Sequence, residues 1–377
     1  METDRAPRSI RVTLFPLGKE ILPNDMSATA ETIAIGMPVE IGQIERALKQ
    51  LWEQGGEGMA RASLVNLAVY SEAPGSLEAS TQIVAQVTED HACRAIVIAA
   101  TPSGGEDRVQ AWISAHCHVS GTDSKHICSE QISFSLEGSF ARLLPNIVFS
   151  HLDSDLPLYL WWQGEFHDPM DAQLWAWVDR LIFDSHDWKD FNAQMRLVQT
   201  AQEESNQRVV LCDLNWTRLT QTRLAIARFF DQTTCISQLT EIEKVEIDFA
   251  PGFHSTAILL LGWLIAQLGW MPTAAPEENR FLLGDPCGRP IEVTLREMAG
   301  DPVSRCSIFC GKEEFRVVNA PDTDLIAISH YVAGKERMNQ LLPAPGIGPV
   351  ALMDEELMRG GTHRVYLRAV EAVRDWL

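Results

Sequence analysis

Positive charge is scarce in this sequence. Its 377 residues include 31 Lys and Arg against 51 Asp and Glu, which gives a formal net charge of −20. Nucleic-acid binding depends on Lys and Arg that neutralise phosphates, and anionic membrane surfaces attract the same side chains, so we expect neither partner. An acidic surface favours solubility and a protein partner with a basic face.

Long hydrophobic runs are absent as well. The longest, from Ala257 to Ala266, is shorter than the roughly 20 residues that cross a bilayer, and it indicates a buried helix. Residues 1–15 lack the continuous apolar stretch of a secretory signal. The eight cysteines are scattered instead of densely spaced, so we expect mostly reduced thiols and a cytoplasmic protein.

The chain also lacks the short motifs of the common nucleotide-binding and hydrolytic enzymes. The Gly-Lys pairs at Gly18, Gly311 and Gly334 do not complete a P-loop, and no GxGxxG follows the first expected strand. GxSxG and HExxH are missing too. These absences leave no signature of a catalytic or cofactor-binding residue.

What is present predicts an α/β protein with two domains. Hydrophobic residues make up 46% of the chain and charged residues 22%, which are ordinary globular values. We expect an irregular N-terminal segment over 1–38, an α/β domain over 39–165 and an α+β domain over 166–377.

The N-terminal domain is predicted to hold a mixed sheet flanked by helices. Strand patterns at Leu64–Tyr70 and Arg94–Ala100 enclose a helix capped by Ser76, a βαβ unit that implies parallel pairing. Alternating apolar and polar residues over Ala111–Val119 and Cys128–Leu136 predict an antiparallel pair added to that sheet. Further expected elements are helices at 39–52 and 139–149 and a loop and strand at 153–162.

The C-terminal domain is predicted to combine helices with short strands and to end in two terminal helices. The expected helices lie at 170–180, 188–200, 214–230 and 255–270, and the terminal pair follows a Pro- and Gly-rich loop at 343–349. The expected strands lie at 245–249, 291–295, 303–309 and 315–318, and the last two form a hairpin.

One short span offers the residue types of a metal site: His116, Cys117, His118, His126 and Cys128. Zinc needs four converging ligands, and alternation along a strand lets at most two of the first three share a face. Buried cysteines beside half-exposed histidines therefore explain the span better. We predict no metal site here.

A second pattern, Asp153-Ser154-Asp155, places two carboxylates before a strand, where they would hold Mg²⁺ against a diphosphate. The same pattern recurs at Asp322-Thr323-Asp324, which favours a capping or loop role for both.

Cys306 and Cys310 are the candidate redox pair. If both lie on one strand, their Cα atoms are roughly 13 Å apart, whereas a disulfide requires less than about 7 Å. The pair can then close only if the strand breaks.

A tryptophan-rich region carries the remaining candidates. Eight of the 11 Trp fall between Trp161 and Trp270; such side chains serve cores, interfaces and sugar platforms, and the core is the commonest use. Arg218 and Arg223 lie on loosely the same side of a helix and would clamp a carboxylate or phosphate. The candidate interface or motif residues are Asp155, Pro157, Trp161, Trp162, Asp184, Ser185, Trp216, Arg218 and Arg223.

Six blocks of this sequence resemble the glucose-6-phosphate dehydrogenase assembly protein family, OpcA. They are ICSEQI (127–132), DSDLPLYLWW (153–162), IFDS (182–185), LNWTRLTQTR (214–223), LLLGWLIAQLGW (259–270) and the final helix with Tyr366. The resemblance implies a non-enzymatic effector or assembly subunit that binds glucose-6-phosphate dehydrogenase in the oxidative pentose phosphate pathway. It supplies no catalytic residue or cofactor, and in cyanobacteria it implies a link to thioredoxin, which motivates the redox candidates.

Two other functions stay open. An enzyme or sensor of a phosphosugar would use the Arg218 and Arg223 clamp with Asp153 and Asp155 holding a metal. A structural subunit of another complex would need neither.

Overall fold

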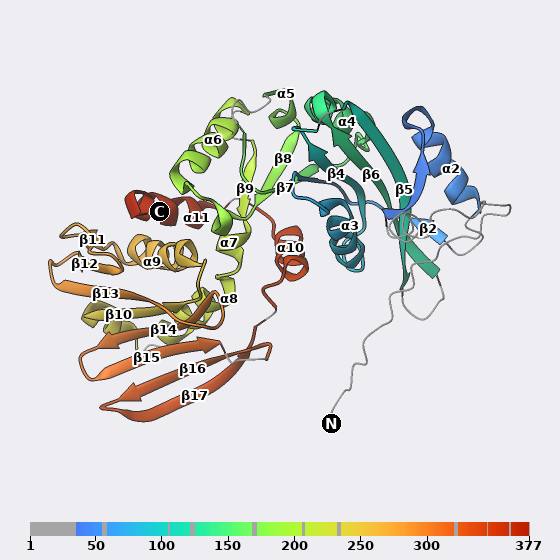
Figure 1. The fold of residues 1–377 in the computed structure, drawn as a ribbon. Helices are drawn as coiled ribbons and strands as arrows, with labels where there is room; N and C mark the ends of the chain where they lie inside the picture. The colour runs from blue at the N-terminus through green and yellow to red at the C-terminus, as the bar shows by residue number, and fades with distance from the viewer. Residues whose placement is uncertain are drawn as a thin grey trace. The chain divides into compact units, whose positions relative to one another are not determined.

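The computed structural model describes residues 35–54, 59–104, 106–120, 125–167, 172–205, 208–231, 235–319, 323–344, 346–361 and 363–376. Of the segment 1–38 that we expect to be irregular, residues 1–34 lie outside the described residues. The chain divides into two compact units (Figure 1). Unit 1 runs up to Gln163 and includes Trp177–Asp179, whereas unit 2 holds Gly164–Ala176 and the chain from Arg180 onward.

Unit 1 is built on the predicted βαβ unit, which the structure confirms. Strand β3 (Val65–Ser71) pairs in parallel with β4 (Cys93–Thr101), and helix α3 (Ser76–Val87) packs against both. The two strands are apolar almost throughout because neighbours cover both faces. Ser76 is not the cap that we predict: the N-cap position is taken by Gly75 in a left-handed conformation, and Ser76 is the first helical residue.

The mixed character of this sheet is also confirmed. Strand β6 (Lys125–Glu137) pairs in parallel with β4 and antiparallel with β5 (Arg108–Ser120). In unit 1 the strand order is β1-β5-β6-β4-β3-β7, and β2 pairs with β6. The remaining elements are β1 (Met37–Val39), η1 (Ile41–Gln43), α2 (Ile44–Gln54), β2 (Met59–Arg61), η2 (Gly138–Leu143), α4 (Leu144–His151) and β7 (Leu158–Gln163).

Two short parallel strands, β8 (Val178–Phe183) and β9 (Val210–Asp213), are joined by α6 (Phe191–Glu204), and their paired residues from Arg180 onward belong to unit 2. The helix predicted over 170–180 is wrong in extent, because α5 spans only Ala172–Trp175 and the following residues enter β8. An apolar strand buried between neighbours has the same composition as a buried helix, and only its pairing with β9 separates the two.

The helix predicted over 214–230 is divided into α7 (Leu214–Thr217) and α8 (Thr220–Phe230). The break falls where Leu219 N bonds to Trp216 O, three residues back, at 3.1 Å. This tighter turn interrupts the four-residue pattern of the α-helix.

A second sheet completes unit 2, with the order β11-β12-β13-β10-β14-β15-β16-β17. Register aligns Leu295, Ile247, Cys306, Val317 and Ile328 across five strands, so one face is apolar. Helices α8 and α9 pack on this sheet. The strands are β10 (Lys244–Phe249), β11 (Met271–Pro272), β12 (Arg280–Gly284), β13 (Pro290–Glu297), β14 (Val303–Cys310), β15 (Glu313–Asn319), β16 (Leu325–Val332) and β17 (Lys335–Pro343).

Helix α9 (His254–Leu268) is the apolar helix that we predict, and its residues are buried along nearly its whole length. The terminal helices α10 (Pro349–Met358) and α11 (Arg364–Val373) are confirmed, and α11 packs closely on α9. Short 3₁₀ turns lie at Ser185–Asp187, Ile236–Glu241 and Arg374–Trp376. None of the helices described is long and apolar enough to cross a membrane.

Candidate functional site

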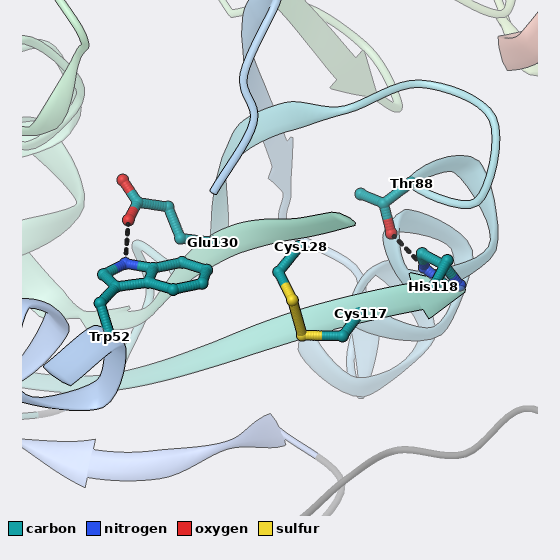
Figure 2. The surroundings of a disulfide bond; sticks show 6 residues. All are labelled: Trp52, Thr88, Cys117, His118, Cys128 and Glu130. Carbon is teal, nitrogen blue, oxygen red and sulfur yellow. Dashed lines mark hydrogen bonds between the residues drawn. A yellow bond between two sulfur atoms is a disulfide. The ribbon is translucent and has the colours of Figure 1, made fainter. Parts of the chain in front are cut away.

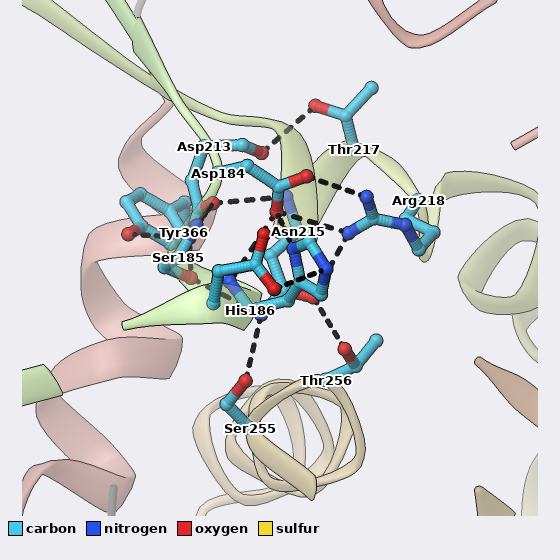
Figure 3. A network of polar contacts seen from close by, with 11 residues as sticks. Asp184, Ser185, His186, Asp213, Asn215, Thr217, Arg218, Ser255, Thr256 and Tyr366 are labelled. Atoms are coloured by element: carbon cyan, nitrogen blue, oxygen red, sulfur yellow. Dashed lines mark hydrogen bonds and ion pairs between the residues drawn. The ribbon is translucent and has the colours of Figure 1, made fainter. Parts of the chain in front are cut away.

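The carboxyl ends of β8 and β9 bring three of the sequence blocks together in unit 2. Phe183 pairs with Asp213 in the parallel register, so the residues after each strand emerge side by side. The IFDS block ends at this point, and the LNWTRLTQTR block begins there. Tyr366 reaches the same place from α11 (Figure 3). The structure therefore unites blocks that are distant in sequence.

Asp213 is the centre of this polar network. It is fully buried, and its carboxylate accepts hydrogen bonds from Ser185 N (3.0 Å), Ser185 Oγ (2.7 Å), Asn215 N (2.9 Å) and Tyr366 Oη (3.0 Å). Burial, and then the nearby carboxylate of Asp184, raise the pKa of Asp213 to about 6, although the hydrogen bonds from Ser185 and Tyr366 lower it. The carboxylate oxygens of Asp213 thus receive their hydrogen bonds from other residues of the protein.

Asn215 extends the network to helix α9. Its Nδ2 donates to Ser185 Oγ and to Ser255 Oγ, each at 3.2 Å, and its Oδ1 accepts from Thr256 (Figure 3). Asn215 and Thr256 have no exposed surface. Buried polar groups need such partners, so this network specifies how α9 sits against the two strands.

Asp184 and Arg218, two predicted candidates, form an ion pair. Arg218 Nη2 lies 2.6 Å from Asp184 Oδ2, and Nη1 lies 3.2 Å from Oδ1. His186 Nδ1 lies 2.9 Å from Asp184 Oδ1, and its ring stacks on Phe253. Burial opposes ionisation of Asp184, but His186 and Arg218 outweigh it and lower its pKa to about 2.

Arg223, the other half of the proposed anion clamp, is held in a different way. Its guanidinium lies 3.5 Å from the centroid of the Trp216 ring, and its Nη2 donates to Trp216 O at 3.2 Å. Burial, and then the nearby Arg359, lower the pKa of Arg223 to about 9. Trp216 is itself 2% exposed and packs against Tyr366. Arg218 and Arg223 thus serve separate contacts within the protein.

A cavity of about 370 Å³ lies beside Arg218. Its polar lining includes Thr217, Arg218, Gln221, Asp301, Asn319 and Asp324. The lining combines one arginine with carboxylates, so the cavity is not an evident anion site. Asp322, the first carboxylate of the second Asp-x-Asp pattern, lies outside the described residues.

The remaining tryptophan-block candidates lie in unit 1. Trp161 and Trp162 are 5% and 8% exposed, and the Trp162 ring lies 4.2 Å from that of Tyr70, so both belong to the core. Asp155 and Pro157 are the exposed members of the predicted set. Buried Asn66 anchors their loop by hydrogen bonds to Asp153 and Leu156 backbone atoms.

The ICSEQI block supplies a buried ion-pair centre that we did not predict. Glu130, 1% exposed, lies 2.6 Å from Arg94 Nη1 and 2.8 Å from Arg61 Nη2, and Trp52 Nε1 donates to it at 3.0 Å (Figure 2). Arg94 also pairs with Glu45 of α2 at 2.7 Å. The network fastens helix α2 to β4 and β6.

The residues with metal-ligand chemistry at 116–128 lie on β5 and β6. Cys117 and Cys128 lie opposite each other on β5 and β6 and form a disulfide (Figure 2), which removes both thiols as ligands. His116 is buried and contacts Gln131 at 2.9 Å, whereas His118 contacts Thr88 at 3.4 Å. Alternation correctly placed the two strands but did not foresee the disulfide.

Cys306 and Cys310 are free thiols on the same strand, β14. They are 1% and 3% exposed, and burial raises the pKa of each to about 12. Extended backbone separates their Cα atoms by roughly 13 Å. Neither the spacing nor the protonation state suits a disulfide between them.

Two buried carboxylates, one in each unit, were not predicted from the sequence. Asp213 and Glu130 are both buried carboxylates within strands, where composition alone predicts apolar residues. A signal existed for Asp213, since an Asp between an apolar strand and a helix suits an N-cap, and its side chain does accept from Asn215 N of α7. Glu130 offered no comparable signal.

In the described network the hydroxyl of Ser185 lies beside the Asp213 carboxylate, but both groups are buried and bonded within the fold. Ser185 Oγ, 1% exposed, donates to Asp213 and accepts from Asn215, while His186 pairs with Asp184 and Asp187. The described residues do include one group with metal-ligand chemistry, formed by Cys212, Glu356 and His363.

Comparison with known families identifies two regions. Residues 84–200 match the sequence profile described as the N-terminal domain of a glucose-6-phosphate dehydrogenase subunit, in the OpcA family. Residues 209–370 match the profile for the C-terminal domain of the same subunit. The first profile continues past Gln163 and ends within α6, and the second begins at β9.

Curated relatives come from cyanobacteria. A protein of Nostoc punctiforme, provisionally named OxPP cycle protein OpcA, is 29% identical over 299 residues, which cover 76% of this chain and 58% of that protein. Its namesake in Synechocystis is 29% identical over 228 residues, covering 58% of this chain and 46% of the relative. The chain thus spans about half the length of these relatives.

Among solved structures, the aldose-aldose oxidoreductase of Caulobacter crescentus aligns with 82% of this chain and 96% of its own. The identity is 11% and the TM-score 0.47, values too low to carry an inference about activity.

Proposed function

This chain belongs to the glucose-6-phosphate dehydrogenase assembly protein family, OpcA, and we propose on that basis that it is a non-enzymatic effector or assembly subunit of glucose-6-phosphate dehydrogenase. The observation that carries the proposal is the ordered match of both subunit domains, over 84–200 and 209–370. The chain would promote the active form of the enzyme in the cytoplasm, by binding that form more tightly than the inactive one.

The polar network supports a binding role over a catalytic one. Asp184 is paired with Arg218, Ser185 is bonded to Asp213, and Arg223 lies on Trp216. Groups engaged in this way organise the fold and are not poised for proton or group transfer. In this proposal, the sequence blocks that resemble the family hold the core together, and the core supports the outer surface that binds the dehydrogenase.

The direct test is the kinetics of the cognate dehydrogenase with and without the full chain. We expect a higher kcat or a lower KM for the sugar phosphate, together with co-elution of the two proteins on size-exclusion chromatography. An unrelated protein of similar size and net charge serves as the control for non-specific effects. Unchanged kcat and KM with separate elution would refute the proposal.

The predicted contact residues allow a sharper test. Asp155 and Pro157 are exposed on a loop that Asn66 anchors, so a change there affects the surface more than the core. We expect Asp155→Lys to weaken binding to the dehydrogenase. Asp231→Lys makes the same charge change at an exposed helix end in unit 2 and is the matched control. Equal affinities of the two variants would remove this loop from the interface.

The rival function, a phosphosugar enzyme or sensor, rests on the cavity beside Arg218. This function requires Arg218 to break its ion pair with Asp184. The proposed metal ligands Asp153 and Asp155 lie in unit 1, whereas Arg218 lies in unit 2. Thermal stabilisation by glucose 6-phosphate with Mg²⁺, lost in Arg218→Ala, would favour this function over the effector role.

A further inference from the structure

Three metal-ligand side chains converge in the core of unit 2. Cys212 lies in β9, Glu356 in α10 and His363 at the start of α11. They are 0%, 1% and 9% exposed. Their ligand atoms lie within 4.8 Å of one another. Among the described residues, these three form a group that could hold a metal ion.

Two of the three separations between these atoms match the edges of a zinc tetrahedron. With ligand distances of about 2.3 Å for sulfur and about 2.0–2.1 Å for nitrogen and oxygen, tetrahedral angles require an S···N edge of about 3.6 Å and an N···O edge of about 3.3 Å. Cys212 Sγ lies 3.7 Å from His363 Nε2, and His363 Nε2 lies 3.2 Å from Glu356 Oε2. The same imidazole nitrogen faces both other ligands, as a shared ion requires.

The carboxylate of Glu356 divides its two oxygens between different tasks. Oε1 accepts a hydrogen bond from Thr217 Oγ1 and lies 3.8 Å from Arg359 Nη1. Oε2 is fully buried and faces His363 Nε2 at 3.2 Å, in a geometry outside that of a standard hydrogen bond. A buried carboxylate oxygen without a well-formed hydrogen bond is costly, and coordination of a cation would remove that cost.

Neighbouring groups resemble the outer shell of a metal site. Arg180 Nη1 donates to Cys212 Sγ at 3.5 Å, and its Nη2 donates to Gly361 O at 3.1 Å. Donors of this kind stabilise a metal-bound thiolate, and Thr217 would orient the ligating carboxylate. The negative charges of the Cys212 thiolate and the Glu356 carboxylate would neutralise Zn²⁺. Arg180 and Arg359 lie next to these two ligands and would not coordinate the ion.

We propose that Cys212, Glu356 and His363 bind one zinc ion, with water in the fourth position. The ion would fasten α10 and the beginning of α11 to β9, elements that are more than 130 residues apart in sequence. This site is independent of the proposed function, because it concerns how the C-terminal helices are held and not what the protein activates.

The test is metal analysis of the full chain, purified without chelators or an affinity metal. We expect about one zinc per chain by mass spectrometry. Cys212→Ser should lose the zinc, whereas Cys306→Ser, at a buried free thiol outside the cluster, should retain it. Thr217→Val should keep the ion but weaken its affinity about tenfold, as loss of an outer-shell partner does.

Cobalt substitution makes the test independent of variants that fail to fold. Co²⁺ added to the chelator-treated wild-type chain should produce thiolate-to-cobalt charge-transfer absorption and intense tetrahedral visible bands, and zinc should displace them. A folded wild-type chain that contains no zinc, takes up none and shows no cobalt–thiolate absorption would overturn the proposal.

Discussion

At the scale of residues, two neighbouring carboxylates in the network respond to their surroundings in opposite directions. Asp184 has strong cationic partners, and its pKa falls to about 2. Asp213 has only neutral donors in a fully buried place, and its pKa rises to about 6. The difference arises because Arg218 and His186 compensate the desolvation of one carboxylate, whereas hydroxyl and amide groups do not compensate that of the other.

This contrast predicts how Asp213 affects stability. Its pKa is higher in the folded chain than its ordinary value of 3.8. The folded state therefore favours the protonated group, and this stabilisation is complete below pH 3.8 and lost as the pH rises through about 6. The expected change in unfolding free energy is on the order of 3 kcal/mol.

Asp213→Asn isolates this contribution, since an amide does not titrate and the hydroxyls of Ser185 and Tyr366 can reorient toward it. The measurement is the wild-type minus variant difference in unfolding free energy by urea titration at several pH values. We expect the difference to fall as the pH rises from 3.8 to about 6. A difference that stays constant over this interval would contradict the raised pKa.

At the scale of elements, the contact between α9 and α11 depends on Gly262. A methyl group added there would meet the carbonyl oxygen of Ala369 and lie 2.9 Å from Val373 Cγ2. The obstruction includes backbone, so a side-chain rotation cannot relieve it. The close approach of these two helices explains a glycine in the middle of an otherwise apolar, buried helix.

We predict that Gly262→Ala destabilises the protein by about 1–3 kcal/mol through overpacking. The gain of about 1 kcal/mol in helix propensity opposes this effect and does not cancel it. Thermal and urea unfolding measure the change. Gln267→Ala, at an exposed position of the same helix, should stay within about 0.5 kcal/mol of wild type. Stabilisation by Gly262→Ala would show that α11 can move away at little cost.

Elements differ in how far their local pattern predicts them. Helices α2, α6 and α9 and strands β3 and β4 were predicted close to their positions, because apolar spacing and composition are properties of one segment. Strands β12, β16 and β17 were missed. β17 is largely exposed, and its extended form depends on pairing with β16, which no local pattern records.

At the scale of the whole molecule, the charge of −20 predicts how association with the dehydrogenase depends on salt. If the docking surface of the enzyme is comparatively basic, long-range attraction accelerates encounter. The Debye length shrinks from about 30 Å at 0.01 M to about 3 Å at 1 M ionic strength. We expect the association rate constant to fall at least about tenfold across this range.

Stopped-flow or surface-based kinetics at several salt concentrations would measure this change. Circular dichroism over the same range controls for loss of folded protein. The dissociation rate constant should change much less, because steering acts on encounter more than on the docked complex. An association rate that is unaffected by salt would indicate an interface dominated by apolar contact.

The sequence by itself determined the α/β class, the βαβ unit, the buried helix at 254–268 and the acidic character, all of which follow from local composition and periodicity. Only the tertiary structure decided which polar groups meet. Tyr366 joins Asp213 across 153 positions, and Cys117 joins Cys128 through strand register. The physical reason is that a polar group is stabilised in the core only by its particular partner, and partners distant in sequence are chosen by the packing of the whole unit.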